Sequence, residues 1–242
     1  CWADRVQPAA RTTPEAPEIQ GLLAEMLAGG VSHCLIEVSS HALDLKRVWG
    51  VHFDIAAFTN LSPEHLDFHE TMEDYFEAKK KLFFLNAKKR TAVVNQDDPW
   101  GKRLINELPL KTVSFGLGPA AIVRAANIRL SESGIKADID YPGGQIKIGS
   151  RLMGRHNLYN ILTAVAAGLA LNLPAAAIKD GIADLAEIPG RLERIENSLG
   201  FQVFVDYAHT DEAMRSLLET VRELKPARII LVFGAGGDRD KS

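Results

Sequence analysis

Short apolar runs alternate with helical patterns along the first part of the sequence. Residues 34–38, 55–58 and 91–95 are apolar runs of strand length, which is typical of strands buried on both faces. Residues 13–28 begin with Thr-Pro-Glu and end before two glycines, the usual start and stop signals of a helix, and a second helix is expected at 72–87. Strands separated by helices predict an α/β fold with a mainly parallel sheet flanked by helices.

The pattern changes between residues 111 and 152. Short alternating runs separated by Gly, Ser and Pro predict antiparallel strands and hairpins there, forming a smaller antiparallel sheet. Helical patterns return at about 157–171 and 174–185.

The segment IPGRLERI is an expected domain boundary. After it, a strand at 201–209, a helix at 211–224 and a buried strand at 227–237 that enters a glycine turn predict the start of a second Rossmann-like α/β domain. We therefore expect one domain over residues 1–188 and part of another over 189–242.

Composition excludes several classes of protein. The 242 residues are 46% hydrophobic and 24% charged with a net charge of -3, so nothing indicates binding to nucleic acid or to a membrane surface. No apolar run reaches the roughly 18–20 residues of a membrane span. Two cysteines, Cys1 and Cys34, form no disulfide framework, and Cys34 is expected to be a buried thiol in a reducing compartment, the cytoplasm. A first residue other than Met, and a last residue within a glycine-rich turn, suggest a chain cut at both ends.

Three side chains near predicted strand ends are candidate metal ligands. Glu37 follows an apolar run, and an acid at the carboxyl end of a strand can hold Mg²⁺, although a solvated acid is equally consistent. His65 and His69 would share one face of a helix. A metal-dependent hydrolase built on them is an alternative, but HLDFH lacks the Glu of the HExxH motif, so two surface histidines are the simpler interpretation.

Lys79, Lys80 and Lys81 follow one another on a predicted helix that also carries aromatic residues. At least one of them must point toward the apolar side of that helix. A partly buried lysine has a lowered pKa and can become a nucleophile, whereas a lysine whose stem lies along the surface does nothing chemical. The glycine turn at 234–237 could bind phosphate but is not a GxGxxG motif.

Eight segments together resemble, in sequence and in order, the Mur ligase family, and the resemblance covers nearly the whole chain. It is strongest to the members that add meso-diaminopimelate to UDP-N-acetylmuramoyl-L-alanyl-D-glutamate. The segments are RTTPEAPEIQ (11–20), EVSSHALDLKRV (37–48), FTNLSPEHLDFH (58–69), YFEAKKKLF (75–83), GRHNLYNILTA (154–164), GRLERI (190–195), VDYAHT (205–210) and FGAGGDRDK (233–241).

This resemblance implies an ATP-dependent amide-bond ligase of peptidoglycan precursor synthesis that works through an acyl phosphate. It implies that Glu37, His65 and Lys79 act in catalysis as Mg²⁺ ligands, with Lys79 carbamylated by CO₂, while Lys80 and Lys81 stay solvated. A carbamate supplies the anionic oxygen that Mg²⁺ prefers.

The remaining roles follow from the same resemblance. Substrate-binding positions are Thr12, Thr13, Ser39 and Arg47; ATP-binding positions are Asn60, Asn157, Asn160, Arg191, Asp206, Tyr207 and His209, with Asp206 toward the ribose. Tyr207 could equally be a core residue, and His156 has no assigned role.

The resemblance also implies binding partners, and the sequence differs from the family pattern at two places. The partners would be a UDP-muramoyl-dipeptide, ATP and a diamino acid, in a monomeric protein of the bacterial cytoplasm, with a lysine-adding homologue as the alternative. No Gly-Lys-Thr or Gly-Lys-Ser occurs in the sequence, so the phosphate-binding loop of the family is missing. Asp211 stands where the family usually has Pro. We expect these 242 residues alone to be inactive.

Overall fold

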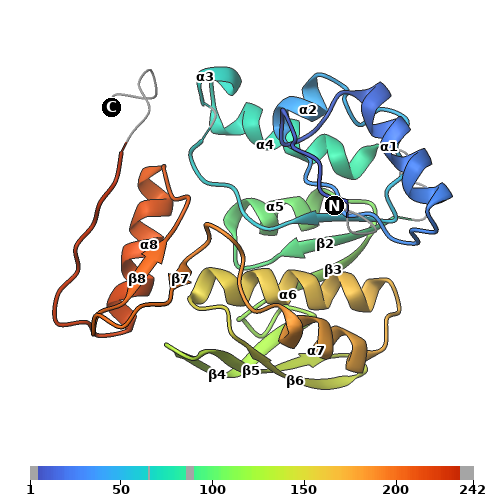
Figure 1. The fold of residues 1–242 in the computed structure, drawn as a ribbon. Coiled ribbons are helices and arrows are strands. Elements are labelled where there is room, and N and C mark those ends of the chain that lie inside the picture. Colours follow the sequence, from blue (N-terminus) through green and yellow to red (C-terminus); the bar gives the residue numbers. More distant parts are fainter. Residues whose placement is uncertain (1–4, 65, 86–89, 235–242) are drawn as a thin grey trace. The chain divides into compact units, whose positions relative to one another are not determined.

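The computed structural model describes residues 5–64, 66–85 and 90–234, which divide into two compact units (Figure 1). The first unit comprises Cys1–Ala56 and His65–Arg90, and the second comprises Ala57–Glu64 and Thr91–Ser242.

The first unit contains four helices among its described residues. Its core is a cluster of four buried side chains, Ile19, Leu43, Val48 and Val51, against which Leu82 of the last helix packs. The helices are α1 (Ala16–Ala28), α2 (Ser40–Asp44), α3 (Leu66–His69) and α4 (Met72–Phe84).

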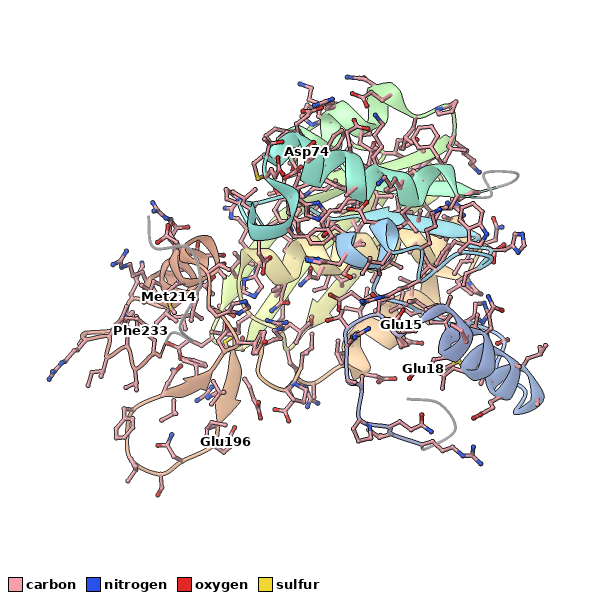
Figure 2. The ribbon with its side chains drawn as sticks, turned by 90° about the horizontal axis from the view of Figure 1, so that it is seen from above. Glu15, Glu18, Asp74, Glu196, Met214 and Phe233 are labelled. Carbon is pink, nitrogen blue, oxygen red and sulfur yellow. The ribbon has the colours of Figure 1, made fainter. Side chains whose placement is uncertain are left out.

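Helix α1 begins at Ala16, with Glu15 as its N-cap residue and Glu18 in its first turn (Figure 2). The sequence signal placed this start two residues earlier, with Thr13 as the cap in place of Glu15. That placement is wrong because the Thr13 hydroxyl is used elsewhere, in hydrogen bonds to the segment that precedes α2. The helix ends before Gly29, as predicted.

Residues 31–39 form no strand, contrary to the prediction for 34–38. Ile36 and Val38 pack against the core cluster, whereas Leu35 is fully exposed and Cys34 is an exposed free cysteine. An apolar run becomes a buried strand only where neighbouring strands take up its backbone hydrogen bonds, and none pairs with it within the described residues. The prediction of a buried Cys34 thiol is therefore wrong.

The second unit is built on a six-stranded sheet in the order β1-β2-β3-β4-β5-β6. Strands β2, β3 and β4 pair in parallel, and β4, β5 and β6 pair antiparallel (Figure 1). The antiparallel strands expected as a smaller sheet thus continue the same sheet. The strands are β1 (Ile55–Phe58), whose last two residues belong to this unit, β2 (Thr91–Asn95), β3 (Lys111–Gly116), β4 (Val123–Ser131), β5 (Gly134–Tyr141) and β6 (Gly144–Ser150).

Three helices cover this sheet. Helix α5 (Pro99–Glu107) contacts β2, α6 (Arg155–Ala170) lies on β2, β3 and β4, and α7 (Ala175–Asp184) contacts β6 (Figure 1). Helix α6 buries Leu158, Leu162 and Val165 completely, so its apolar stripe forms the centre of this core.

The last part of the second unit contains a two-stranded antiparallel sheet of β7 (Glu193–Ile195) and β8 (Val203–Val205), followed by α8 (Asp211–Glu223). The strand predicted at 227–237 is absent from its described part, residues 227–234, and the glycines beyond 234 lie outside the described residues. Val232 is 90% exposed, and Phe233 lies on the extended chain beyond α8 (Figure 2). As at 31–39, an apolar run without a neighbouring strand stays unpaired.

The predicted α/β class, with parallel strands flanked by helices and with antiparallel strands after them, is confirmed. No helix in the described part of the chain is both long and apolar enough to cross a lipid bilayer.

Candidate functional site

Thr13 ties together two of the segments predicted to bind substrate. Its side chain is buried, its hydroxyl donates to the Glu37 carbonyl oxygen at 2.8 Å, and its Oγ1 accepts from the Ser39 backbone N–H at 3.1 Å. Both capacities of the hydroxyl are therefore used for structure. The Glu37 side chain itself is exposed.

Arg47 extends the same group. A guanidinium N–H donates to the Thr13 carbonyl oxygen at 3.4 Å, and Nε lies 3.1 Å from Glu15 Oε1. The Arg47 side chain is 12% exposed, and its buried Nε has no well-directed hydrogen bond within the described residues. The Arg47 guanidinium is therefore held in place by Thr13 and Glu15, and its planar set of N–H donors is of the kind that binds carboxylates.

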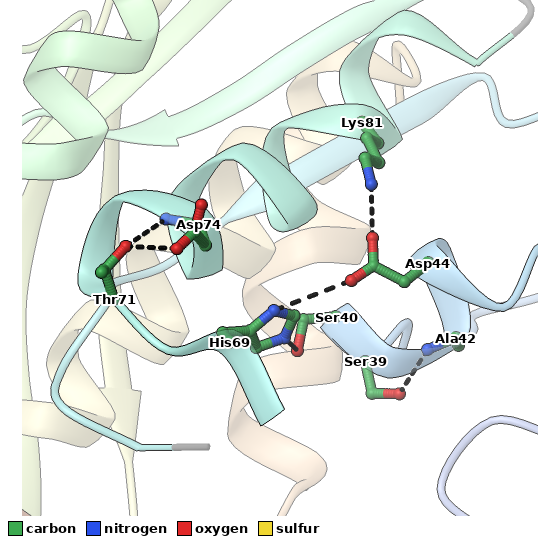
Figure 3. Close-up of polar contacts among 8 residues, drawn as sticks. All are labelled: Ser39, Ser40, Ala42, Asp44, His69, Thr71, Asp74 and Lys81. Atoms are coloured by element: carbon green, nitrogen blue, oxygen red, sulfur yellow. Dashed lines mark hydrogen bonds and ion pairs between the residues drawn. The ribbon is translucent and has the colours of Figure 1, made fainter. Parts of the chain in front are cut away.

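Ser39 caps α2. Its Oγ accepts from the Ala42 backbone N–H at 3.2 Å (Figure 3), which leaves the hydroxyl proton available to another acceptor. Thr12 is exposed beside Thr13. The four predicted substrate-binding residues thus come from one part of the first unit.

The three lysines of α4 have different surroundings. The half-buried Lys79 holds its ammonium 5.2 Å from the centre of the Tyr75 ring. Lys80 pairs with Glu77 at 2.8 Å and lies over Phe76, with only 19% of its side chain exposed, whereas the exposed Lys81 pairs with Asp44. Only Lys81 has the solvated environment expected for Lys80 and Lys81.

His69 is buried, which corrects its interpretation as a surface histidine. It is 5% exposed, its Nε2 lies 2.8 Å from Ser40 Oγ, and its Nδ1 lies 3.7 Å from Asp44 Oδ2 (Figure 3). Local sequence could not reveal this burial because Ser40 is 29 positions away. The predicted metal ligand His65 lies outside the described residues. Among the described residues, no group of three or more His, Cys, Asp or Glu side chains could hold a metal ion.

The second unit carries all of the predicted ATP-binding residues. Asn157, at the start of α6, is 2% exposed; its amide donates to the Met153 carbonyl oxygen at 2.8 Å, and its Oδ1 accepts from Asn160 at 3.1 Å. Asn157 therefore orients the start of the helix and the exposed Asn160. Asn60 is exposed directly after β1, beside Thr59, whose carbonyl oxygen is bound by Asn95.

Asp97 fixes the same helix from outside its sequence neighbourhood. Its carboxylate accepts from the Tyr159 hydroxyl at 2.9 Å and from the Leu117 backbone N–H at 2.6 Å. Burial and the bond to Asp97 raise the pKa of Tyr159 to about 12. Sequence reasoning missed this pair because Asp97 and Tyr159 are 62 positions apart.

Arg191, Tyr207 and His209 form an exposed cationic and aromatic group. The Arg191 guanidinium lies 5.1 Å from the centre of the Tyr207 ring, and the Tyr207 and His209 rings are 4.9 Å apart. His209 also lies 3.7 Å from Glu64. Tyr207 is 63% exposed, so core packing, the alternative for this residue, is wrong.

Asp206 organises the backbone around this group. One carboxylate oxygen accepts from the Leu192 N–H at 2.6 Å, and the other accepts from the Ala208 N–H at 2.7 Å. Burial lowers the pKa of the neighbouring His156. The negative charge of Asp206 opposes this shift, and the positive charge of Arg191 adds to it. Its imidazole therefore favours the neutral form more than an exposed histidine does.

Two family models match the sequence. The Mur ligase middle domain matches residues 2–168, and the Mur ligase glutamate ligase domain matches residues 190–242. The chain belongs to the Mur ligase family. The resemblance in the sequence is thereby confirmed at the level of the family.

Curated relatives within the Mur ligase family match along nearly the whole chain. UDP-N-acetylmuramoyl-L-alanyl-D-glutamate–2,6-diaminopimelate ligase of Geobacter metallireducens is 48% identical over 99% of this chain and 48% of its own length. The ligase of the same name from Thermosynechococcus vestitus is 41% identical over 100% of this chain and 49% of its own length. The chain spans about half the length of the curated relatives it matches.

Solved structures of Mur ligases have the same fold. A UDP-N-acetylmuramoyl-L-alanyl-D-glutamate–2,6-diaminopimelate ligase superposes with a TM-score of 0.78 at 31% identity, over 94% of this chain and 47% of the other. A MurF structure from Acinetobacter baumannii reaches a TM-score of 0.65 at 23% identity, over 70% of this chain and 37% of the other, and supports the fold alone.

Proposed function

We propose that this chain is part of an ATP-dependent ligase that joins meso-diaminopimelate to UDP-N-acetylmuramoyl-L-alanyl-D-glutamate in peptidoglycan precursor synthesis. The observation that carries the proposal is the 48% identity, along 99% of the chain, to a ligase of that name. The two family models support a division of the whole protein near residues 188 and 189. Use of ATP favours the bacterial cytoplasm as its location, and the family resemblance favours a monomer.

The proposed reaction has two steps. A substrate carboxylate oxygen attacks the γ-phosphorus of ATP, so that an O–P bond forms, the bond to the β-phosphate oxygen breaks, and ADP leaves. The amino group of the diamino acid then attacks the acyl carbon, a C–N bond forms, the C–O bond to phosphate breaks, and inorganic phosphate and a proton are released. The first step brings two anions together, the carboxylate and the triphosphate, so positioning and charge neutralisation dominate its barrier.

The first unit would bind the muramoyl-peptide and a metal. Arg47 supplies a guanidinium that Thr13 and Glu15 hold in place, and Ser39 supplies a hydroxyl proton. Thr13 holds these segments, and Thr12 is exposed beside it. We assign the metal to Glu37, His65 and Lys79; bound Mg²⁺ would neutralise phosphate charge.

Lys79 fits this assignment only as a carbamate, because an ammonium repels a cation. Its neutral amine would attack CO₂, form an N–C bond and lose a proton, which converts a cation-forming group into an anionic oxygen donor. The resemblance matches Lys79 to the family lysine that becomes carbamylated, and Lys79 lies half-buried in α4 beside Tyr75.

The second unit would bind ATP. Arg191, Tyr207 and His209 offer a cation and two exposed rings, which suit phosphate contact and base stacking. Asn60 and Asn160 are exposed, while Asn157 would act by orienting Asn160. Asp206, whose carboxylate holds two backbone N–H groups, would reach the ribose with its remaining acceptor capacity.

The experiment follows an isotope through the complete chain encoded by the gene. The muramoyl-dipeptide carries ¹⁸O in its free side-chain carboxylate, and meso-diaminopimelate and lysine are offered separately. We expect an amide product and one ¹⁸O in the released phosphate with meso-diaminopimelate. Amide formation only with lysine would change the amino-acid assignment, and unlabelled phosphate or hydrolysis without amide would overturn the ligase. The 242-residue chain, which contains no Gly-Lys-Thr or Gly-Lys-Ser, is expected to turn over no ATP.

A further inference from the structure

His69 is anchored to the start of α2. The imidazole is 5% exposed and the Ser40 side chain is 1% exposed, so the 2.8 Å contact between Nε2 and Oγ is shielded from water (Figure 3). A buried polar pair of this kind holds its elements firmly, because separating the two groups would leave both unsatisfied.

The other face of His69 meets α4. Its ring stacks on Tyr75, with centroids 5.1 Å apart and an interplanar angle of 17°. The Tyr75 ring in turn lies 5.2 Å from the Lys79 ammonium. Residues four apart lie on the same face of a helix. Tyr75 therefore contacts both His69 and Lys79, and the position of the Lys79 side chain depends on His69 through Tyr75.

Ser40 is equally close to a proposed ligand. It directly follows Ser39, the cap of α2, and stands three positions after Glu37, whose carbonyl oxygen is fixed by Thr13. A continuous path of contacts therefore runs from the Glu37 segment through Ser40, His69 and Tyr75 to Lys79.

The arrangement of Ser40, His69 and Asp44 resembles a nucleophilic triad, but it does not fit that chemistry. Ser40 is too deeply buried for its hydroxyl to attack a substrate, and the distance of 3.7 Å between Nδ1 and Asp44 Oδ2 exceeds a hydrogen bond. Asp44 also pairs with Lys81. The group is a structural connection between two elements.

We propose that His69 is a positioning residue that holds the Glu37–Ser40 segment and Lys79 at a fixed separation. The proposal rests on the proposed function, since it gives a role to His69 only if Glu37 and Lys79 share a metal. His69 acts through Ser40 and Tyr75, and it is not a catalytic residue.

The test compares Ser40→Ala, His69→Ala and His69→Gln in the complete chain, with His52→Gln as the matched control because His52 is exposed in the same unit. The probes are Mg²⁺ titration and the ¹³C NMR signal of a carbamate formed from labelled bicarbonate. We expect Ser40→Ala and His69→Ala to weaken Mg²⁺ binding about 10- to 100-fold and to lower the carbamate signal. His69→Gln should recover most of both, because its amide can still reach the Ser40 hydroxyl.

Each outcome decides between the proposals. A wild-type chain that neither binds Mg²⁺ nor shows a carbamate on Lys79 overturns the proposed metal site, and the role of His69 with it. A wild-type chain that shows both, with Ser40→Ala and His69→Ala equal to His52→Gln, overturns the role of His69 alone. If His69→Ala does not fold, Ser40→Ala decides, since it removes one hydroxyl and leaves the imidazole in place.

Discussion

Thr13 shows how much a single hydroxyl can organise at the residue scale. It joins Glu37, 24 positions away, and Ser39 through one donor and one acceptor in a buried place. Thr13→Val keeps the shape but removes two part-buried hydrogen bonds, to the Glu37 carbonyl oxygen and from the Ser39 N–H, so we expect the free energy of unfolding to fall by about 1–3 kcal/mol. Urea denaturation measures this loss, and Thr13→Ser should restore most of it.

Thr12→Val is the matched control, because Thr12 is exposed one position away. We expect a change within about 0.5 kcal/mol for this surface substitution. Equal losses for Thr12→Val and Thr13→Val would contradict the structural role of the Thr13 hydroxyl.

His156 makes a second prediction at the residue scale, on pH. Burial lowers its pKa, so on acidification the unfolded chain takes up the proton first. The stability that neutral His156 contributes is therefore present above pH about 6.5 and is lost as the pH falls below that value. We expect His156→Gln to lose less stability than the wild type between pH about 7.5 and about 5.5, measured by urea denaturation.

His52→Gln controls for the removal of an imidazole, because His52 is exposed. Its stability should depend on pH as the wild type's does. If His156→Gln also follows the wild-type dependence, burial of His156 does not couple to folding.

Helix α5 carries a prediction at the scale of the element. Asp98 caps it by accepting from the Gly101 N–H at 2.8 Å, and a Cβ on Gly101 would stand 2.0 Å from the Asn95 backbone oxygen at the end of β2. Gly101→Ala must push the helix away from the strand, and we expect a loss of about 1–3 kcal/mol or more. Gly21 in α1 has no atom within 4 Å of its Cβ position, so Gly21→Ala should gain about 0.5–1 kcal/mol.

Tryptophan fluorescence during urea denaturation can follow both variants, since Trp49 lies in the first unit and Trp100 in the second. A decrease in the free energy of unfolding for Gly101→Ala, together with an increase for Gly21→Ala, would support close packing of α5 on β2. If Gly101→Ala leaves the free energy of unfolding unchanged, the start of α5 can move without loss of stability.

Local signals predicted the elements that local interactions determine. The predicted helix α4 is capped by the Thr71 hydroxyl, and the predicted run 91–95 became a strand because a neighbouring strand pairs with it. Helix α5, which Asp98 caps, was not predicted. The prediction failed at 34–38 and 227–234, where the apolar pattern is present but no strand among the described residues pairs with it. It also failed at His69, whose burial depends on Ser40 and so on the fold of the first unit.

The same limit applies to the candidate site. Sequence order identified the segments that carry Thr13, Ser39 and Arg47, and the structure brings these residues together. The sequence could not distinguish Asn157, whose amide is buried, from the exposed Asn160. That distinction depends on tertiary packing, which no local pattern contains.

The exposed run at residues 230–233 has a consequence for the whole molecule. Ile230 is 73% exposed and Val232 90% exposed, in a segment that pairs with no strand in the part of the chain that the structure describes. Such a segment offers apolar surface and hydrogen bonds to another copy of the chain, so we expect the 242-residue chain to self-associate as its concentration rises. Val232→Lys should weaken this association, because a buried charge would oppose strand pairing.

Val6→Lys is the matched control, since Val6 is 83% exposed but lies outside any such run. Sedimentation velocity over a series of concentrations measures the mass of the species present. We expect Val6→Lys to associate as the wild type does and Val232→Lys to remain smaller at every concentration. If both variants associate like the wild type, the attraction lies elsewhere on the chain, and residues 230–233 are harmless despite their exposure.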